Sequence, residues 1–437
     1  MAEVPGRKGR CDFCRSTFRC HAIRDADWCH HLDIDFLVDA LCLASIGGSC
    51  PRAAARDCRY GAAKSELWES VVLLVALYRG GCDLAAPFKY LPANARQGTT
   101  LYSEMKIGKT AILGAGGWGT ALAWLWGKNG RPISLWGHNG PRIAHMQKTR
   151  ENNNYLPGIK LPPSVDVTSD LEDCAAADLI VFVTPSFALR EIATRVRKSI
   201  ANPDAVFLSC TKGIEHLTGM RMSQILGEVC PGHRIAVLSG PNLAVEIAQN
   251  LPTASAIGCD DANCAASLQG VLGSARFRIY TSQDVVSIEL GGALKNVFAI
   301  AAGISDGLGL GNNSKAALVT RSLAELVRLG IAMGGNVTGF YGLSGAGDLI
   351  LTCYSERSRN HTVGERLGRG EAVAQITESM KTVAEGIPTA RSARECARRL
   401  NIATPIIDEV YAVLYEQKKP TVALEELLRR EQKPEQL

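Results

Sequence analysis

The stretch Thr110–Gly119, which reads Thr-Ala-Ile-Leu-Gly-Ala-Gly-Gly-Trp-Gly, decides the fold of this chain. Residues 110–113 predict a short buried strand, and the pattern from Thr120 to Lys128 predicts a helix. The glycines over 114–119 fit G-x-G-x-x-G and stand between that strand and that helix. This context indicates a dinucleotide-binding site, whereas the same glycines elsewhere would carry little information.

The three glycines of the G-x-G-x-x-G pattern each have a physical task. Gly114 permits a tight turn, Gly116 lets the backbone approach a pyrophosphate, and Gly119 lets the helix pack closely on the strand. The free N–H groups at the start of the helix then face the negative charge. The sequence therefore predicts a Rossmann-type nucleotide-binding unit.

The next predicted strand, Ile133–Trp136, is followed by Gly137-His138-Asn139. An acidic residue at this place would bind the ribose hydroxyls of NAD and repel the 2′-phosphate of NADP. None is present, so NADPH is allowed, and His138 or Arg142 is near enough in sequence to meet its phosphate. The alternative for His138 is a loop histidine that touches nothing.

Further strand-like runs continue the α/β pattern, over 179–183, 205–209, 235–238, 253–258 and 276–280. The first of these runs is continuously apolar, as in a strand buried on both faces of a parallel sheet. Lys212 follows the second run and Gly240-Pro241-Asn242 follows the third, at the edge where such sheets bind ligands. A lysine at the end of a strand is usually solvated, but this position favours a function. We expect an α/β fold with a doubly wound parallel sheet.

From about Asp284 the strand pattern stops and helical spacing takes over. Helices are predicted over 286–304, 315–333, 361–368, 380–400 and 406–415. The all-helical second domain of a two-domain dehydrogenase has this pattern. We therefore expect an extension over 1–104, an NAD(P)-binding Rossmann domain over 105–283 and a helical substrate-binding domain over 284–437.

The stretch Glu289–Asn296 contains one cation, Lys295, which follows a run of small residues. On a helix, we expect these small residues to let a flat ring approach the backbone while the ammonium group points to whatever lies beside the ring. A lysine near a helix start is ordinarily a solvated surface group. The functional interpretation depends on the dinucleotide loop that the same chain carries.

Two further segments of the helical half carry chemistry. Gly345-Ala346-Gly347 precedes Asp348, and Thr352 adds a hydroxyl four residues later. Ser358-Arg359-Asn360 stands at a predicted helix start, where a guanidinium beside free N–H groups makes a phosphate receptor. The alternative is that Ser358 is only an N-cap and Arg359 is solvated.

The 15 cysteines are unevenly distributed, because eight of them precede residue 100. Cys11 and Cys14 have the spacing of a zinc-knuckle pair, for which the other ligands would be Cys20, Cys29, His30 and His31. No second C-x-x-C or H-x-x-x-H follows in this part. The seven later cysteines are expected to be reduced and mostly buried.

Residues 1–104 differ in composition from the rest, and Met105 stands directly before the first predicted strand. If the true start is Met105, residues 1–104 would be translated upstream sequence, which would explain the change in composition. The alternatives are a metal-binding appendage and another accessory segment. We expect no catalytic role for these residues.

The overall composition excludes several classes of protein. Apolar residues make up 46%, charged residues 21%, and the formal net charge is +5, without a basic block that would indicate a nucleic-acid partner. No apolar run of about 18 residues predicts a membrane span. The N-terminus lacks the pattern of a signal peptide, so a cytoplasmic protein is expected.

Nine segments, in order, resemble the bacterial-type NAD(P)-dependent sn-glycerol-3-phosphate dehydrogenase family, from Met105 to near the C-terminus. They are GAGGWGTALA (114–123), LWGHN (135–139), NNNYLPG (152–158), TKG (211–213), SGPNLA (239–244), GGALKNVFAIAAG (291–303), GLSGAGDLILTC (342–353), SRN (358–360) and AEG (384–386). The resemblance implies interconversion of dihydroxyacetone phosphate and glycerol 3-phosphate with NADH or NADPH. It also implies a fold like that of 6-phosphogluconate dehydrogenase, a homodimer, and supply of glycerol 3-phosphate for phospholipid synthesis.

The resemblance also implies roles for individual residues. Lys295 would be the acid/base, and the substrate would further be bound by Lys212, Gly240, Asn242, Asp348, Ser358, Arg359 and Asn360. The cofactor would be contacted by Gly114, Gly116, Gly117, Trp118, Gly119, His138, Lys212, Ala244, Arg359, Val383 and Glu385. Asn242 stands where bacterial members often have a hydroxyl residue, and it can still hydrogen-bond. No metal is expected, because the ammonium groups polarise the carbonyl.

Two alternatives remain open at this stage. Another two-domain dehydrogenase, of the 6-phosphogluconate or hydroxyacid type, is disfavoured by the segments 291–296 and 358–360. A non-catalytic redox sensor, with metal or a partner bound by the cysteine-rich segment, is disfavoured because Lys295, Lys212 and Asp348 are all present.

Overall fold

The protein is described from a computed structural model, which covers residues 107–380, 383–432 and 434–435. These residues all belong to one compact unit, Thr99–Leu437. The zinc ligands considered above, and the proposed start at Met105, lie outside the described residues. The seven cysteines of the described part are free and buried, as expected.

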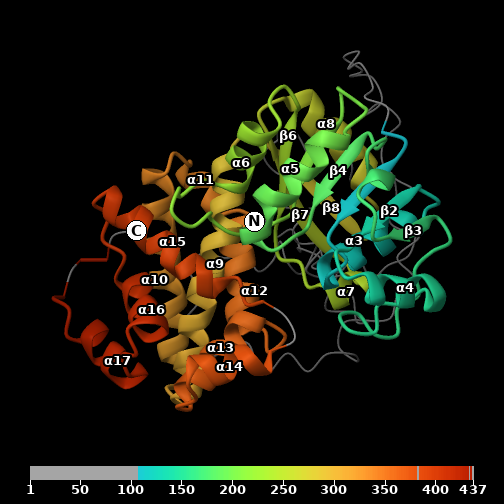
Figure 1. Ribbon diagram of the computed structural model, residues 1–437. Coiled ribbons are helices and arrows are strands. Elements are labelled where there is room, and N and C mark those ends of the chain that lie inside the picture. The colour runs from blue at the N-terminus through green and yellow to red at the C-terminus, as the bar shows by residue number, and fades with distance from the viewer. Residues whose placement is uncertain (1–106, 381–382, 433, 436–437) are drawn as a thin grey trace, which may run out of the picture. The chain divides into compact units, whose positions relative to one another are not determined.

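An eight-stranded sheet forms the first half of this unit (Figure 1). Its strands are β1 (Thr110–Leu113), β2 (Ile133–Trp136), β3 (Val165–Thr168), β4 (Leu179–Phe182), β5 (Val206–Ser209), β6 (Ile235–Ser239), β7 (Thr253–Cys259) and β8 (Phe277–Ser282). Their order across the sheet is β3-β2-β1-β4-β5-β6-β7-β8, and neighbours are parallel except for β6 and β7.

The predicted doubly wound sheet is confirmed, with two differences. The edge strand β3 went unpredicted, because its four residues include an exposed Asp166 and look like loop sequence. β7 runs antiparallel to β6. The segment between these two strands holds only the five-residue helix α7 (Ala244–Ala248), which is too short to return the chain to the starting edge of the sheet.

Helices cover both faces of the sheet and bury its strands on both sides (Figure 1). One face packs against α3 (Gly117–Gly127), α4 (Gly140–Thr149), α7 and α8 (Ala262–Leu272). The other face packs against α5 (Leu189–Ser199) and α6 (Met222–Val229), with the short 3-10 turns η5 (Glu172–Cys174) and η6 (Ser186–Ala188) nearby in the chain. This burial explains the continuously apolar strands.

The second half of the unit is helical, as predicted. It contains α9 (Val285–Gly307), α10 (Gly311–Ala332), α11 (Val337–Phe340), the π-helical turn η7 (Leu343–Gly347), α12 (Asp348–Tyr354), α13 (Arg359–Gly368), α14 (Val373–Ser379), α15 (Gly386–Arg399), α16 (Pro405–Tyr415) and α17 (Pro420–Leu428). The helix predicted from residue 380 begins only at Gly386. The short helices α11, α12 and α14 and the C-terminal α17 were not predicted.

Helix α9 lies at the centre of the helical half and packs against α10, α12, α13 and α15 (Figure 1). By length and composition alone it could span a membrane, with a mean hydropathy of 1.5 in its most apolar window. That window is 94% buried inside the protein, as expected for the core helix of a globular unit.

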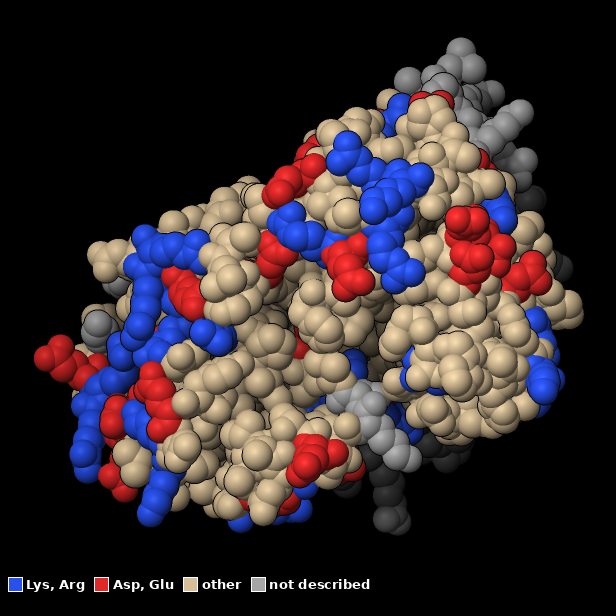
Figure 2. Space-filling model, in the orientation of Figure 1, with Lys and Arg blue, Asp and Glu red and all other residues tan. Residues whose placement is uncertain are grey.

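Charges on the surface of the helical half are locally compensated. Figure 2 shows basic and acidic side chains side by side over the end formed by α15, α16 and α17. Arg394 pairs with Glu416 at 2.9 Å, and Lys418 pairs with Glu426 at 2.7 Å. Each pair joins a partly buried cation to an exposed carboxylate. Such surface pairs contribute little to stability, and they compensate the charges on this surface.

The crossing of α9 and α13 is set by glycines on both helices. A Cβ built on Gly303 would lie 2.0 Å from the carbonyl oxygen of His361, and one on Gly364 would lie 2.0 Å from that of Ile300. Gly307 makes an equally close approach to Glu365. The two backbones therefore touch, and larger residues would push the helices apart.

We predict that Gly364→Ala lowers the free energy of unfolding by about 1–3 kcal/mol, because the added methyl group overpacks a backbone contact. Gly270→Ala is the matched control, since Gly270 lies inside α8 and a Cβ there would meet nothing within 4 Å. The control should be neutral or stabilise by about 0.5–1 kcal/mol. Urea unfolding of both variants measures this, and equal stabilities would contradict the proposed packing.

Candidate active site

The glycine loop after β1 has the geometry that its sequence predicts. Gly114 has a φ of +129°, and a Cβ there would lie 2.4 Å from the carbonyl oxygen of Val183. A Cβ on Gly119 would lie 1.9 Å from the carbonyl oxygen of Gly114, so α3 can approach β1 only with glycine at this position. These two glycines fix the shape of the loop.

The rest of the loop suits the diphosphate of a dinucleotide. Nothing lies within 4 Å of the position that a Cβ would take on Gly116, so the backbone here is open to a ligand. The first turn of α3 has no capping side chain, which leaves its N–H groups directed at the same place. The indole N–H of Trp118 is buried without a partner, and Gly117 faces Tyr155 and Ala244.

The end of β2 presents a cation rather than an acid. Asn139 caps α4 by accepting from the N–H of Arg142 at 3.0 Å, and His138 is exposed. The Arg142 guanidinium donates to the Tyr155 hydroxyl at 3.0 Å and lies over that ring. The sequence did not single out Tyr155, although it belongs to the segment 152–158 that carries part of the resemblance.

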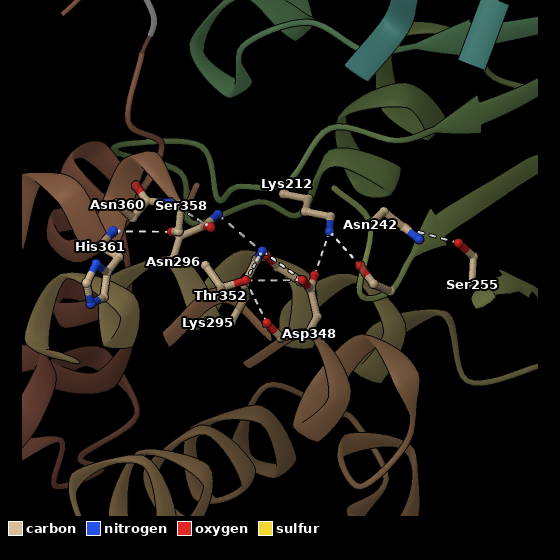
Figure 3. A network of polar contacts seen from close by, with 12 residues as sticks. Lys212, Asn242, Ser255, Lys295, Asn296, Asp348, Thr352, Ser358, Asn360 and His361 are labelled. Carbon is tan, nitrogen blue, oxygen red and sulfur yellow. Dashed lines mark hydrogen bonds and ion pairs between the residues drawn. The ribbon is translucent and has the colours of Figure 1, made fainter. Parts of the chain in front are cut away.

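Two lysines from different halves of the unit share one carboxylate, as Figure 3 shows. Lys295 Nζ on α9 donates to Asp348 Oδ1 at 2.8 Å, and Lys212 Nζ, after β5, donates to Asp348 Oδ2 at 2.5 Å. Asp348 is 1% exposed and Lys295 is 8% exposed. The structure thus brings together three residues that the sequence analysis named from separate motifs.

Neighbouring groups complete the hydrogen bonds of these lysines. Lys295 Nζ also donates to Thr352 Oγ1 at 2.6 Å, and Lys212 Nζ donates to the Gly240 carbonyl at 3.1 Å. The Thr352 hydroxyl in turn donates to the Asp348 carbonyl oxygen. Each ammonium group therefore keeps one of its three N–H bonds for another acceptor. Thr352 was noticed in the sequence but given no role.

Burial lowers the pKa of Lys295 from its usual value to about 8. The negative charge of Asp348 opposes this shift, and the positive charge of Lys212 adds to it. A lysine in this state exchanges a proton within the neutral pH range, which a solvated lysine does not do.

The π-helical turn Leu343–Gly347 places Asp348 at the first position of α12. This turn packs on α9, where a Cβ on Gly291 would lie 2.7 Å from the Ser344 carbonyl oxygen. A Cβ on Gly292 would lie 2.2 Å from the Ser239 hydroxyl oxygen. The expectation that these small residues make room for a flat ring is therefore wrong, because protein atoms fill the space beside them.

Glu289, in the same stretch as Lys295, makes contacts that hold a neighbouring helix in place. Its buried carboxylate accepts from the backbone N–H of Ser223 and from Arg221, each at 2.7 Å, and so holds the start of α6.

The Ser-Arg-Asn segment forms the first turn of α13. Ser358 is the N-cap and accepts from the N–H of His361, while Arg359 is exposed and donates to the Val383 carbonyl at 2.7 Å. Asn360 is buried, donates to Asn296 at 2.8 Å and accepts from the N–H of Gly386 at 2.9 Å. Its side-chain amide thus ties α13 to α9 and α15 (Figure 3), and the sequence did not indicate that Asn296 is its partner.

Two further predicted residues make contacts with the sheet. Glu385 accepts from the Ser186 hydroxyl at 2.6 Å, which links the start of α15 to the loop after β4. Burial raises the pKa of this carboxyl group. Asn242 accepts from the Ser255 hydroxyl at 2.9 Å and donates to the Ala254 carbonyl at 3.3 Å (Figure 3). The side chain of Val383 is exposed, and only its backbone carbonyl is seen to accept from Arg359.

A Rossmann-type sheet with an open glycine loop, facing a helical half that carries a buried lysine–carboxylate cluster, defines a dinucleotide-dependent oxidoreductase. Two family models match the chain in order. The NAD-dependent glycerol-3-phosphate dehydrogenase N-terminus matches residues 109–265, and the C-terminus of the same family matches residues 284–425. The chain belongs to the NAD-dependent glycerol-3-phosphate dehydrogenase family, which confirms the resemblance.

Individual relatives support the same assignment. The chain is 45% identical to the glycerol-3-phosphate dehydrogenase (NAD(P)+) of Syntrophotalea carbinolica, over 76% of this chain and 99% of the relative. It is 46% identical to that of Geobacter metallireducens, over 75% and 98%. The crystal structure of glycerol-3-phosphate dehydrogenase from Coxiella burnetii is similar with a TM-score of 0.72 and 36% identity, covering 74% of this chain and 99% of that chain.

The open space beside Gly116 and the close backbone contact at Gly119 predict different effects of substitution. Gly116 has an extended backbone and open space beside it, so Gly116→Ala should fold normally but raise the Kd of NADPH by roughly tenfold or more. Gly119→Ala should instead destabilise the protein, because its methyl group would meet the Gly114 carbonyl. Calorimetric titration and thermal melting separate the two effects. Unchanged NADPH affinity in a folded Gly116→Ala protein would argue against a diphosphate at this loop.

Proposed function

We propose that this chain interconverts dihydroxyacetone phosphate and sn-glycerol 3-phosphate with Lys295 as its proton donor and acceptor. The reaction itself follows from the family to which the chain belongs. The observation that supports the residue assignment is the carboxylate of Asp348, shared by Lys295 and Lys212 where the sheet meets the helical half. The rest of the proposal follows from that cluster.

The residues of the glycine loop would hold the cofactor. Its diphosphate fits the open backbone at Gly116 and the start of α3, and Trp118 would give its unpaired indole N–H to the same ligand. Ala244 lies against the loop. Lys212 follows β5 in the sheet half, and Arg359, Val383 and Glu385 belong to the helical half. NAD(P)H supplies the hydride that reduces C2 of the ketone.

Lys295 is the group that completes the reduction. When hydride reaches C2 of dihydroxyacetone phosphate, the carbonyl oxygen becomes an alkoxide, and the Lys295 ammonium gives it a proton. In the reverse direction the neutral amine takes the proton from the C2 hydroxyl. The lowered pKa of about 8 makes both protonation states accessible near neutral pH. Because Lys295 donates two of its N–H bonds to Asp348 and Thr352, the third would be left for the substrate oxygen.

The net charge of the cluster favours the substrate. Two ammonium groups and one carboxylate leave about one positive charge in a buried place, where the carbonyl oxygen gains charge during reduction. Lys212 would polarise the same carbonyl, while Asp348 keeps both lysines in position. This proposal assigns no role to a metal ion, and in the part of the chain that the structure describes no cluster of three His, Cys, Asp or Glu residues suits one.

Arg359 and the start of α13 would bind the phosphate. Arg359 is exposed and is the first residue of α13, and a guanidinium and the free N–H groups of a helix start together favour a dianion. The Ser358 hydroxyl already accepts a hydrogen bond as the N-cap of α13, and the Asn360 amide already bonds to α9 and α15. We therefore assign Ser358 and Asn360 mainly to shaping this receptor. Gly240 and Asn242 would line the site from the end of β6.

Several broader proposals accompany this function. The absence of an acid after β2, with Arg142 held by Tyr155, favours NADPH over NADH. We propose that residues 105–283 bind the cofactor, that 284–437 bind the substrate, and that 1–104 take no part. A cytoplasmic homodimer that supplies glycerol 3-phosphate for phospholipid synthesis is the setting that we propose.

We predict that Lys295→Met lowers kcat for dihydroxyacetone phosphate reduction by about 10²–10⁴-fold, because the alkoxide loses its proton donor. The Kd of NADPH should change little, since Lys295 binds Asp348 and Thr352 and not the glycine loop. Lys148→Met, at an exposed lysine on α4, is the control. Near-normal turnover in the Lys295 variant would contradict the assignment of Lys295 as the proton donor and acceptor.

A further inference from the structure

A second ionic cluster lies outside the site described above, in the helical half, where the Asp306 carboxylate is 29% exposed and its two cationic partners are buried. Asp306 Oδ2, on α9, is 2.6 Å from Lys315 Nζ on α10 and 2.7 Å from His361 Nε2 on α13. The side chains of Lys315 and His361 are 9% and 5% exposed. Three helices therefore meet at one carboxylate oxygen, and the proposed proton transfer uses none of these residues.

The cluster is connected directly to the first turn of α13. His361 follows Arg359 and Asn360 in the same helical turn, and its backbone N–H donates to the Ser358 N-cap at 3.2 Å. A rotation or shift of His361 would therefore move the backbone that carries Arg359. The bond from His361 to Asp306 fixes this turn against α9.

Lys315 connects the cluster to the helix that carries Asp348. Its ammonium group lies 4.6 Å from the ring centroid of Tyr354, the last residue of α12. Asp348 begins the same seven-residue helix, and only residues 355–358 separate α12 from α13. The cluster thus holds both sides of the short segment that joins the lysine–carboxylate centre to the Arg359 turn.

Stability alone does not explain a cluster of this kind. Burying the Lys315 ammonium and partly burying the Asp306 carboxylate costs desolvation energy, and well-packed apolar residues of similar size are often as stable or more stable. Buried polar groups serve better where one exact arrangement is needed, because their partners and angles are specific. The arrangement that this cluster specifies is the position of α13 relative to α9 and α12.

We propose that Asp306, Lys315 and His361 are positioning residues that hold the Arg359 turn at the correct distance from the Lys295–Asp348 centre for a three-carbon phosphorylated ketone. The proposal rests on the proposed function, in which Arg359 binds the phosphate and Lys295 serves the carbonyl oxygen. His361 touches no substrate in this scheme and acts only through the backbone of its own turn.

The test compares two replacements of His361. His361→Phe keeps a flat ring but removes the bond to Asp306, whereas His361→Gln keeps an N–H donor that can reach the same carboxylate. Lys315→Met, which keeps a chain of similar length without the charge, approaches the cluster from α10. Arg369→Gln is the matched control, since Arg369 is the exposed C-cap of the same helix and pairs with Glu365. Arg359→Leu tests the phosphate receptor itself.

We expect His361→Phe and Lys315→Met to raise KM for dihydroxyacetone phosphate by about fivefold or more, while kcat and the Kd of NADPH stay within about twofold. His361→Gln and Arg369→Gln should resemble the unmodified protein. This split distinguishes positioning from general loss of folding, which would reduce the active fraction and kcat together. Circular dichroism melts of each variant accompany the kinetics.

Three outcomes would overturn the inference in different ways. If Arg359→Leu raises KM strongly but both cluster variants leave it unchanged, the cluster is only structural and the proposed phosphate receptor stands. If Arg359→Leu also leaves KM unchanged, the phosphate binds elsewhere and the inference falls together with that part of the proposed function. A fall in kcat in both His361 variants, with KM unchanged, would likewise contradict positioning of the phosphate.

Discussion

The carboxylate of Asp348 is the constraint on which the site depends, because it accepts hydrogen bonds from two lysines that belong to different halves of the protein. Burying three charged groups is costly unless each is paired and hydrogen-bonded. Here both carboxylate oxygens are used, and Thr352 and the Gly240 carbonyl take further N–H groups. Either lysine alone with the carboxylate would give a neutral pair. Both lysines together leave an excess positive charge for the substrate oxygen.

Close backbone packing holds this cluster in place. Gly303 and Gly364 let α9 and α13 touch, and Gly291 lets the π-helical turn before Asp348 lie against α9. Because the helix that carries Lys295 is buried on all sides, its ammonium group has little freedom to move toward solvent. The same packing that stabilises the helical core therefore sets the low pKa of Lys295, since desolvation is the largest cause of that shift.

Sequence reasoning predicted the sheet, the glycine loop and the separate motifs with Lys212, Lys295 and Asp348, because each has a local pattern with a local physical reason. It did not predict which residues pair across the fold. Nothing in the sequence places Asn296 against Asn360 or Ser186 against Glu385, since these contacts depend on how distant helices pack. The glycines before Lys295 show the same limit, because the sequence shows their small size but not that Ser344 and Ser239 lie against them.

The pH dependence of kcat/KM in both directions is the sharpest test of Lys295 as the group that donates and accepts the proton. Reduction needs the Lys295 ammonium, so its rate should fall as pH rises through about 8, and oxidation needs the neutral amine, so its rate should rise over the same range. Asp348→Asn should move both transitions to lower pH, because the Asp348 charge raises the pKa of Lys295. Flat profiles near pH 8, or a shift to higher pH in that variant, would contradict the account.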